Sequence, residues 1–451
     1  MKILHYSLGI PPYRSGGLTK YSVDLMKEQT RQADEVYLLY PGKIGVIHKK
    51  DKIVPNKKLD NIHIYELINP MPVPLLEGII DINAYTQEKN KEIYKKFLEA
   101  INPDVIHIHT WMGLPKEFIE EAKKKHIRII YTTHDYFGLC PKVSLYNMKN
   151  EICKGYCNEA CSKCCQNALS SKKILLLQSH LYKVGKDTKA IKLLRKQQKA
   201  KISKDKQELV NTCKATIDYA PLKNYYNNLF AMVDIFHFNS QMTMETFYSH
   251  IKIKAGKVIP ITHEQIEDKR IKKRTRETIQ FAYLGAQSQE KGYYFLKQIL
   301  DKIPNKEKWK LNLYFQPNQT EDYMCIKEPY SYAQIETVFE DMDVLIVPSL
   351  WKETFGFVVL EALAHGTPVI LSENVGASYL VKQNKTGYIF SNGKELEKKL
   401  EEIIENPSKI EEWNQNILEE KNLILNIEEH AKQIKALYED AEKGGEKDCR
   451  K

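Results

Sequence analysis

The sequence of 451 residues lacks any apolar run long enough for a membrane-spanning helix, which needs about 20 residues. The opening segment Met1–Ser7 carries one basic residue but no apolar stretch of signal-peptide length. These two absences predict a cytoplasmic protein. The chain has nine cysteines, and in a reducing compartment such a number does not indicate a disulfide framework.

Apolar residues make up 42% of the chain and charged residues 28%, which provides for large cores and excludes a wholly disordered chain. At roughly 150 residues per domain, two or three domains are expected. The net charge is +10, and the segment 172–206 holds twelve lysines and arginines against two acids. Because this segment carries the whole excess, the charge is not spread as in a protein that binds nucleic acid over its whole surface.

The first 135 residues alternate short apolar runs with patterns of helical period. The predicted strands are 2–8, 35–40, 62–68, 104–110 and 127–134, and the predicted helices are 18–33, 83–101 and 116–126. Such alternation predicts a parallel sheet with helical crossovers. It stops at a cysteine-rich segment, 140–165, and a basic, mostly helical segment, 170–227, and resumes with strands 233–239 and 257–261. Residues 136–230 are therefore interpreted as an insertion within a domain that comprises 1–261.

The charged segment 262–277 is predicted to be a linker to a second alternating region. That region has predicted strands at 279–285, 309–315, 343–348 and 368–372, and predicted helices at 291–303, 332–341, 355–365, 377–383, 393–405 and 408–421. The pattern predicts an α/β protein with two Rossmann-like, doubly wound domains, 1–261 and 278–425, that face each other across a cleft. Residues 426–451 are predicted to form a C-terminal helix and tail.

A candidate ligand site follows the predicted strand that ends at Pro348. In doubly wound sheets ligands bind at the carboxyl ends of strands, and the free amides of a helix that begins near Phe355 suit a phosphate or diphosphate. Thr354 and Glu361 are seven residues apart and share one face of that helix. On these residues alone, an ordinary helix with an acidic residue before its first turn is an equal alternative.

Glu353 and Glu361, with Phe355-Gly356 between them and Ala362–Ile370 after them, resemble the signature of glycosyltransferase family four. The resemblance implies a GT-B fold and transfer, with retention of configuration, from a nucleotide-sugar donor of the UDP or GDP type. In that family the residue at Glu353 binds the donor sugar and the residue at Glu361 binds the ribose. The donor-binding residues that the resemblance implies are Gly16, Gly17, Thr354, Phe355, Gly356, Phe357 and Glu361.

Three residues are assigned to positioning and charge stabilisation by the same resemblance, namely Glu353, His134 and Lys291. Lys291 matches the family's lysine on the donor diphosphate, but the accompanying arginine is absent, because Ala286 or Gln287 stands there. Gly16-Gly17 resembles the family's glycine pair, and His134 its histidine near the anomeric centre. The alternatives are a solvated lysine, a plain turn and a core histidine. His107 and His109 are interpreted as structural residues.

Six cysteines fall between Cys140 and Cys165. The Cys161–Cys164 spacing is typical of structural zinc sites, and Cys140 and Cys153 complete a predicted set of four thiolates. Free thiols and an iron–sulfur cluster are the alternatives. No cofactor is predicted for catalysis.

The predicted function is transfer of a sugar from a nucleotide-diphosphate sugar to a growing, lipid-linked surface glycan. The basic segment 172–206 either lies on the anionic inner face of the cell membrane or packs on its own domain as a solvated helix. Two alternatives remain open. One is a nucleic-acid-binding protein that uses the cysteine loop and basic helix, although nucleic acid is not the expected partner. The other is a nucleotide-sugar epimerase, which needs no acceptor.

Overall fold

The computed structural model describes residues 1–12, 14–45, 50–74, 78–179, 216–274, 276–421 and 423–440. It divides into two compact units. The first comprises Met1–Phe238, Met244–Ile259 and the C-terminal residues from Ala431, and the second comprises Asn239–Thr243 and Pro260–His430. In the described part of the chain, no helix combines the length and apolar character that crossing a bilayer requires.

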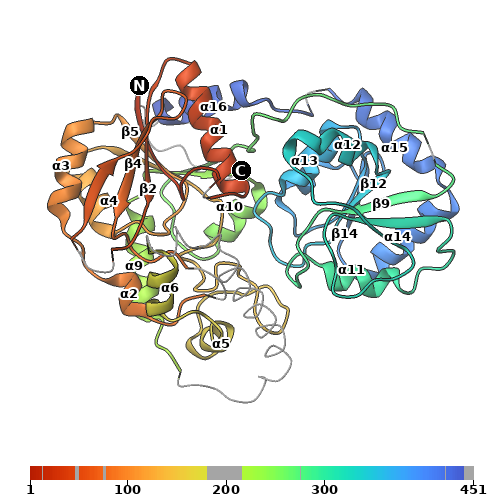
Figure 1. Cartoon of the computed structure of the whole chain (residues 1–451), viewed down its shortest axis with the longest axis horizontal. Helices are drawn as coiled ribbons and strands as arrows, with labels where there is room; N and C mark the ends of the chain where they lie inside the picture. The colour runs from red at the N-terminus through yellow and green to blue at the C-terminus, as the bar shows by residue number, and fades with distance from the viewer. Residues whose placement is uncertain are drawn as a thin grey trace. The chain divides into compact units, whose positions relative to one another are not determined.

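The first unit is built on an eight-stranded sheet in the order β3-β4-β2-β1-β5-β6-β7-β8 (Figure 1). Its strands are β1 (Lys2–Tyr6), β2 (Glu35–Pro41), β3 (Lys52–Pro55), β4 (His63–Ile68), β5 (Val105–Ile108), β6 (Arg128–Thr132), β7 (Ile235–Phe238) and β8 (Gly256–Val258). All neighbours are parallel except β3 and β4. Because β1 pairs with both β2 and β5, the strand order reverses there.

Helices cover this sheet because its central strands are buried on both faces, as parallel strands usually are. They are α1 (Gly17–Arg31), α2 (Ile82–Thr86), α3 (Lys91–Ile101), α4 (Lys116–Lys124), α9 (Ala220–Ala231) and α16 (Ile427–Asp440), with α10 (Gln241–Tyr248) beginning in the second unit's segment. The single helix predicted over 83–101 is wrong. Asn90 caps a new helix there by accepting a hydrogen bond from the Glu92 amide, so α2 and α3 are separate.

The predicted insertion contributes to the core of the first unit. It contains α5 (Asn158–Cys164), α6 (Ser171–Leu177) and α9, whose Leu229 and Phe230 are buried. The Tyr219 hydroxyl, just before α9, donates a hydrogen bond of 2.8 Å to the Ile79 carbonyl. Residues 180–215, which hold most of the basic segment, lie outside the described residues.

The second unit is built on a six-stranded, all-parallel sheet in the order β11-β10-β9-β12-β13-β14. Its strands are β9 (Ile279–Tyr283), β10 (Trp309–Leu313), β11 (Met324–Ile326), β12 (Val344–Val347), β13 (Val369–Ser372) and β14 (Gly387–Phe390). Its helices are α11 (Tyr293–Leu300), α12 (Ile335–Glu340), α13 (Phe357–Ala364), α14 (Gly393–Glu405) and α15 (Ser408–Glu419), with 3₁₀ turns η1 (Tyr332–Gln334) and η2 (Gly376–Leu380). The strand order reverses between β9 and β12.

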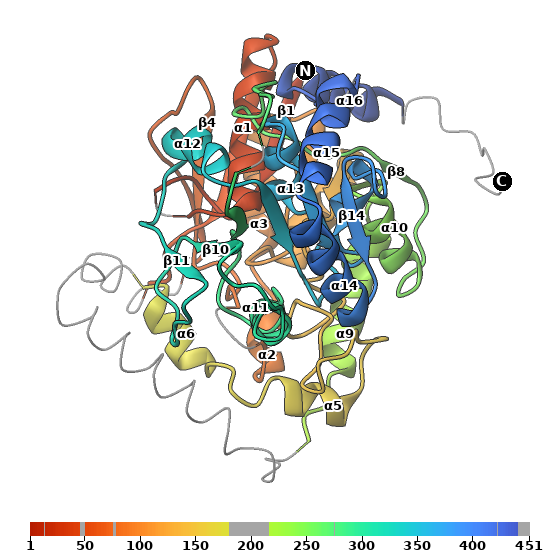
Figure 2. The same cartoon turned by 90° about the vertical axis from the view of Figure 1, so that its right-hand side faces the viewer.

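Two segments pack differently from what their composition indicates. The segment 262–277, predicted as a linker, belongs to the second unit: the buried Lys273 donates to the Phe339 carbonyl at 2.5 Å and its amide donates to Asn414. Helix α16, predicted as a separate C-terminal element, lies beside α1 of the first unit (Figure 2). There the Lys435 ammonium pairs with Asp34 at 2.8 Å.

Candidate active site

Lys291 and Glu353 meet at the point where the second sheet reverses its strand order. Lys291 ends the loop after β9 and Glu353 lies in the loop after β12, which are the positions where doubly wound sheets bind ligands. The Lys291 ammonium lies 2.5 Å from Oε1 of Glu353, and the Ser349 hydroxyl donates to Oε2 at 2.6 Å. The side chains of Lys291 and Glu353 are 31% and 14% exposed, so the pair is accessible to a ligand.

Gly292 allows the two loops to approach this closely. It caps the N-terminus of α11 with φ of 75°, and a Cβ atom at this position would lie 1.8 Å from the carbonyl oxygen of Pro348. Any side chain here would therefore push apart the loops that carry Lys291 and Glu353.

The loop before α13 is held on both sides by hydrogen bonds. The Thr354 carbonyl accepts from the hydroxyls of Ser240 and Thr243, at 2.7 and 3.0 Å. The Phe355 carbonyl accepts from the Ala377 amide, at 2.7 Å. Gly356 then caps α13, and Phe357 is the first residue of that helix. Thr354, Phe355, Gly356 and Phe357 thus form one short, anchored segment beside Glu353.

Glu361 lies one turn further along α13 and has a partner that the sequence analysis does not identify. Its Oε1 atom lies 3.0 Å from Nε2 of His263, and the two side chains are 4% and 1% exposed. The Gln265 amide donates to Nδ1 of His263, so Nε2 carries the hydrogen and donates to Glu361. His263 stands in the segment predicted as a linker, and no spacing rule connects it to Glu361.

In the first unit, Gly16 and Gly17 lie at the start of α1. A Cβ atom on Gly16 would meet nothing within 4 Å, so the backbone there borders open space. His134 follows β6, and its Nε2 atom lies 3.4 Å from Nδ1 of His109. The predicted residues therefore form two groups, one in each unit, at the carboxyl ends of strands in both.

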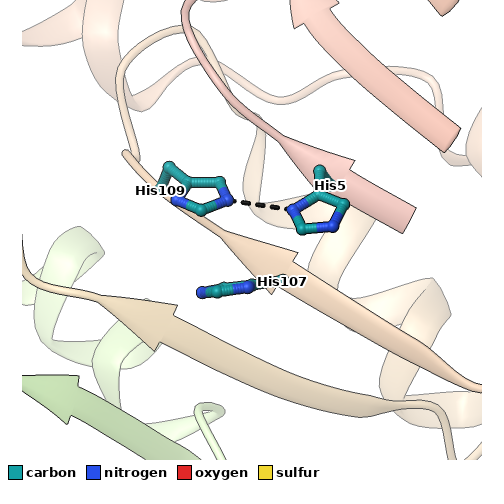
Figure 3. A group of neighbouring side chains, drawn as sticks. All are labelled: His5, His107 and His109. Carbon is teal, nitrogen blue, oxygen red and sulfur yellow. Dashed lines mark hydrogen bonds between the residues drawn. The ribbon is translucent and has the colours of Figure 1, made fainter. Parts of the chain in front are cut away.

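Three buried histidines lie together beneath His134. His5 on β1, His107 on β5 and His109 after β5 offer ring nitrogens within 4.8 Å of one another (Figure 3). All six ring nitrogens already have hydrogen-bond partners, which are His5 with His109, Gln29 with His5, Tyr438 and Thr132 with His107, and His134 with His109. These histidines therefore form a satisfied polar network without a metal ion, in agreement with the structural role expected for His107 and His109.

The cysteine loop does not form a ready-made metal site. Within the described residues, no three cysteine sulfurs lie within 4.8 Å of one another. Burial raises the pKa of the Cys140 and Cys161 thiols to about 12, so both are protonated as placed. A zinc ion on Cys140, Cys153, Cys161 and Cys164 therefore requires these residues to rearrange, and it stays a prediction.

Two family models match the chain. The model described as glycosyl transferases group 1 matches residues 264–420, and the model described as glycosyltransferase family 4 matches residues 15–164. The chain belongs to the glycosyltransferases of the family 4 type. Membership confirms the family resemblance and the enzyme class expected from it, and does not favour the nucleic-acid-binding alternative.

This glycosyltransferase is similar to several known proteins. It is 22% identical over 301 residues to an uncharacterized 42.6 kDa protein in the cps region of Klebsiella pneumoniae, a match that spans 65% of this chain and 63% of that protein. Sucrose-phosphate synthase from Thermosynechococcus elongatus has a TM-score of 0.59 at 15% identity, over 98% of this chain and 99% of the other. Anabaena HepE in complex with UDP-glucose has a TM-score of 0.58 at 13% identity, over 98% and 100%. These structural likenesses confirm the GT-B fold.

Proposed function

We propose that this glycosyltransferase moves a sugar from a UDP-sugar to a growing surface glycan. The Lys291–Glu353 pair at the switch point of the second sheet carries the proposal, because it combines a cation for a diphosphate with an acceptor for sugar hydroxyls. The likeness to a structure that holds UDP-glucose supports the choice of base, and the relative in a cps region supports the choice of product.

The geometry indicates how the donor engages this pair. Lys291 and Glu353 neutralise each other, so an arriving diphosphate competes for the Lys291 ammonium and leaves Glu353 free to accept hydrogen bonds from the sugar. Ser349 keeps one carboxylate oxygen in place during this exchange. The expected arginine is missing at Ala286 or Gln287, so Lys291 and the backbone amides at the start of α13 supply the stabilisation of the leaving diphosphate.

Glu361 is the proposed ribose acceptor. Its carboxylate is buried and held by the Nε2 hydrogen of His263, so it needs no reorientation when the nucleotide binds. Gly16 and Gly17 let the backbone of the first unit approach the donor, and His134 contacts the sugar near the anomeric carbon. The transfer proceeds with retention by same-face displacement, in which the departing phosphate takes the acceptor proton and no side chain acts as nucleophile.

The acceptor is a lipid-linked glycan at the cytoplasmic face of the membrane, reached through the basic segment 172–206. This part of the proposal rests on the charge of the sequence and on the cps relative. The same donor site would also serve an epimerase, and release of UDP that depends on added acceptor separates the two reactions.

Titration with UDP and UDP-glucose, together with turnover of UDP-glucose, tests the assignment. We expect Glu361→Gln to weaken UDP binding by about 10- to 150-fold, the equivalent of a lost hydrogen bond to a charged group. We expect Glu353→Gln to lower kcat with little change in the binding of UDP itself. Glu412→Gln, on the exposed side of α15, is the matched control and should leave both quantities unchanged. Folded Glu353 and Glu361 variants that bind and turn over like the wild type would refute the site.

A further inference from the structure

We propose that the tautomer of His134 is fixed by a one-way chain of eight hydrogen bonds that starts at the Ile259 carbonyl and makes Tyr438, on the C-terminal helix, a positioning residue. The functional meaning of this inference rests on the proposed contact between His134 and the donor sugar. The existence of the hydrogen-bond chain does not rest on that contact. The experiments below therefore test the hydrogen-bond chain and the contact separately.

The hydrogen-bond chain runs through the buried interior of the first unit. From the carbonyl outward, its members are Ile259, His237, Thr132, His107, Tyr438, Gln29, His5, His109 and His134. All side chains from His237 to His109 are fully buried, and His134 is partly buried. Strand register creates the neighbours, because His5 pairs with His107 across β1 and β5, and Thr132 pairs with His237 across β6 and β7.

The direction of the first half follows from one fixed acceptor. A carbonyl oxygen only accepts, so Nε2 of His237 carries the hydrogen that it donates to Ile259 at 2.7 Å. In a neutral ring Nδ1 is then the acceptor, and the Thr132 hydroxyl donates to it at 2.8 Å. The Thr132 oxygen in turn accepts from Nε2 of His107 at 2.6 Å, so Nδ1 of His107 accepts from the Tyr438 hydroxyl at 2.6 Å.

The hydrogen bonds from Tyr438 to His134 must run in the same direction. With its hydrogen given to His107, the Tyr438 oxygen accepts from the Gln29 amide nitrogen at 3.1 Å, and the Gln29 oxygen therefore faces Nε2 of His5 at 2.7 Å. His5 donates from Nε2, so its Nδ1 accepts from Nε2 of His109 at 3.0 Å. Nδ1 of His109 then accepts from Nε2 of His134.

Neutral rings are required for this assignment, and the surroundings keep them neutral. Burial lowers the pKa of His5 and His237 to about 4 and that of His134 to about 3, and burial together with the neighbouring rings lowers the pKa of His109. A protonated ring would donate from both nitrogens. One hydrogen bond of the series would then be lost, because two donors would face each other.

The consequence is a defined chemical role for His134. Its Nε2–H is committed to His109, so Nδ1 carries the lone pair. In this tautomer Nδ1 of His134 can accept a hydrogen bond but cannot donate one, so the ring is not set to protonate a leaving oxygen. The alternative tautomer would reverse every link back to His107 and leave two acceptors facing each other at Thr132.

Long-range ¹H–¹⁵N correlation spectra of the full-length protein with ¹⁵N-labelled histidine test the chain directly, because the two ring nitrogens of each tautomer have distinct shifts. We expect His5, His107, His109, His134 and His237 all to be neutral with the hydrogen on Nε2. An Nδ1–H tautomer or an imidazolium at His134 in the wild-type protein would overturn the proposal, whatever the variants do.

Thr132→Val removes the hydroxyl that transmits the direction. Without this hydroxyl, every hydrogen bond between His107 and His134 can reverse its direction and none is lost. Both tautomers of His134 therefore become populated. Thr132→Ser keeps the hydroxyl and should restore the single Nε2–H form. A single, unchanged His134 tautomer in Thr132→Val would show that the chain does not set it.

Tyr438→Phe makes the same test from α16, because it frees the Gln29 amide to turn over. The matched control is Lys435→Gln, which removes the α16 ion pair with Asp34 but leaves the hydroxyl in place. We expect mixed His134 tautomers only in the phenylalanine variant. Equal spectra of the two variants would mean that docking of α16, and not the hydroxyl, determines the state of His134.

Turnover of UDP-glucose then tests the connection with catalysis. If the two tautomers are equally populated and only one is competent, kcat in Thr132→Val falls by about twofold at unchanged KM, and Thr132→Ser recovers it. Mixed tautomers with unchanged kcat would support the chain and refute the proposed contact of His134 with the reacting sugar.

Discussion

Glu353 and Glu361 stand eight positions apart, yet their surroundings give them different properties. Glu353 is paired with a lysine and a serine at an accessible surface, so its carboxylate can change partners when a diphosphate arrives. Glu361 is enclosed and hydrogen-bonded to His263, so it is fixed before any ligand binds. The first arrangement suits a group that acts during transfer, and the second suits a group that recognises the nucleotide.

The buried histidines predict a loss of stability in mild acid. The folded-state pKa of His5 and of His237 is about 4, below the unfolded value of about 6.5, so between these values the unfolded chain binds protons that the folded chain does not. The free energy of unfolding therefore falls as the pH drops from 6.5 towards 4, by about 1.4 kcal/mol per pH unit for each such histidine.

Urea unfolding at several pH values between 7 and 5 measures this slope before most carboxylates titrate. We expect His237→Gln to reduce the slope of unfolding free energy against pH by about the amount that one histidine contributes. Glutamine offers the same two neighbours a donor and an acceptor. The control is His126→Gln, because His126 is exposed just after α4, where its amide donates to the Lys123 carbonyl. A slope that is the same in all three proteins would contradict the prediction.

At the scale of elements, the apolar runs predicted the central strands well because parallel strands are buried on both faces. The short strands β3, β11 and β14 are missed, since they lie at sheet edges and at most two residues of each are buried. The break between α2 and α3 was also missed, because Asn90 acts as a cap only once the chain turns there. The loops that carry Lys291 and Glu353 could be predicted because each directly follows a strand.

The partners of the site residues could not be predicted in this way. Ser349 and Glu353 are close in sequence, but His263 and Glu361 are 98 positions apart, and His107 and Tyr438 are 331 apart. Such contacts arise when whole helices and strands pack together, and they produce no periodic pattern in the local sequence. The segment 262–277 shows the same limit, since its charges suggest solvent exposure while Lys273 is buried against backbone carbonyls.

The approach of the two loops in the second unit predicts that Gly292→Ala is strongly disruptive. The added methyl group would overlap the Pro348 carbonyl and would also require a positive φ in alanine, which alone costs about 1–2 kcal/mol. We expect a lower Tm and weaker UDP binding, because Lys291 and Glu353 are pushed apart. Gly393→Ala is the matched control, since its methyl group would only touch the Phe295 and Ile299 side chains, at 3.3–3.5 Å. Equal Tm and affinity in both variants would contradict this account.

The cysteine loop provides a second prediction at this scale. Four thiols, of which Cys161 and Cys164 have the two-residue spacing of zinc sites, predict about one zinc ion per chain in protein purified without added metal, as measured by elemental analysis. Zinc would hold Cys140 and Cys161 as thiolates, whereas burial alone keeps them protonated and slow to alkylate. The exposed Cys157 is the internal control and should react in either case. A metal-free preparation that is folded and active would refute the zinc site.

At the scale of the whole molecule, the chain does not divide where its sequence changes character. The last described helix returns to the first unit, and Asn239–Thr243 joins the second. Tyr438 therefore belongs to the same hydrogen-bond network as His5, near the other end of the chain. Removal of the C-terminal helix should consequently affect the histidines of the first unit, although no residue of that helix resembles a family motif.

The surplus of positive charge also belongs to this scale, because one segment accounts for it. The proposed lipid-linked acceptor lies at a membrane, and near an anionic surface each lysine contributes about 1 kcal/mol, less at high salt. The residues with most of this charge lie outside the described part of the chain.

We therefore predict that the protein sediments with phosphatidylglycerol-containing vesicles but not with phosphatidylcholine vesicles, and that salt releases it. Combined replacement of Lys183, Lys186, Lys189 and Lys192 by glutamine should abolish sedimentation while UDP binding stays unchanged. The control replaces the exposed Lys308, Lys394, Lys398 and Lys421 of the second unit, which removes the same charge and should leave sedimentation intact. If both variants lose binding equally, the net charge of the protein, and not the position of the lysines, causes the sedimentation. If neither variant loses binding, the basic segment does not attract the vesicles and is a solvated face of the first unit, because attraction through this segment requires its own lysines.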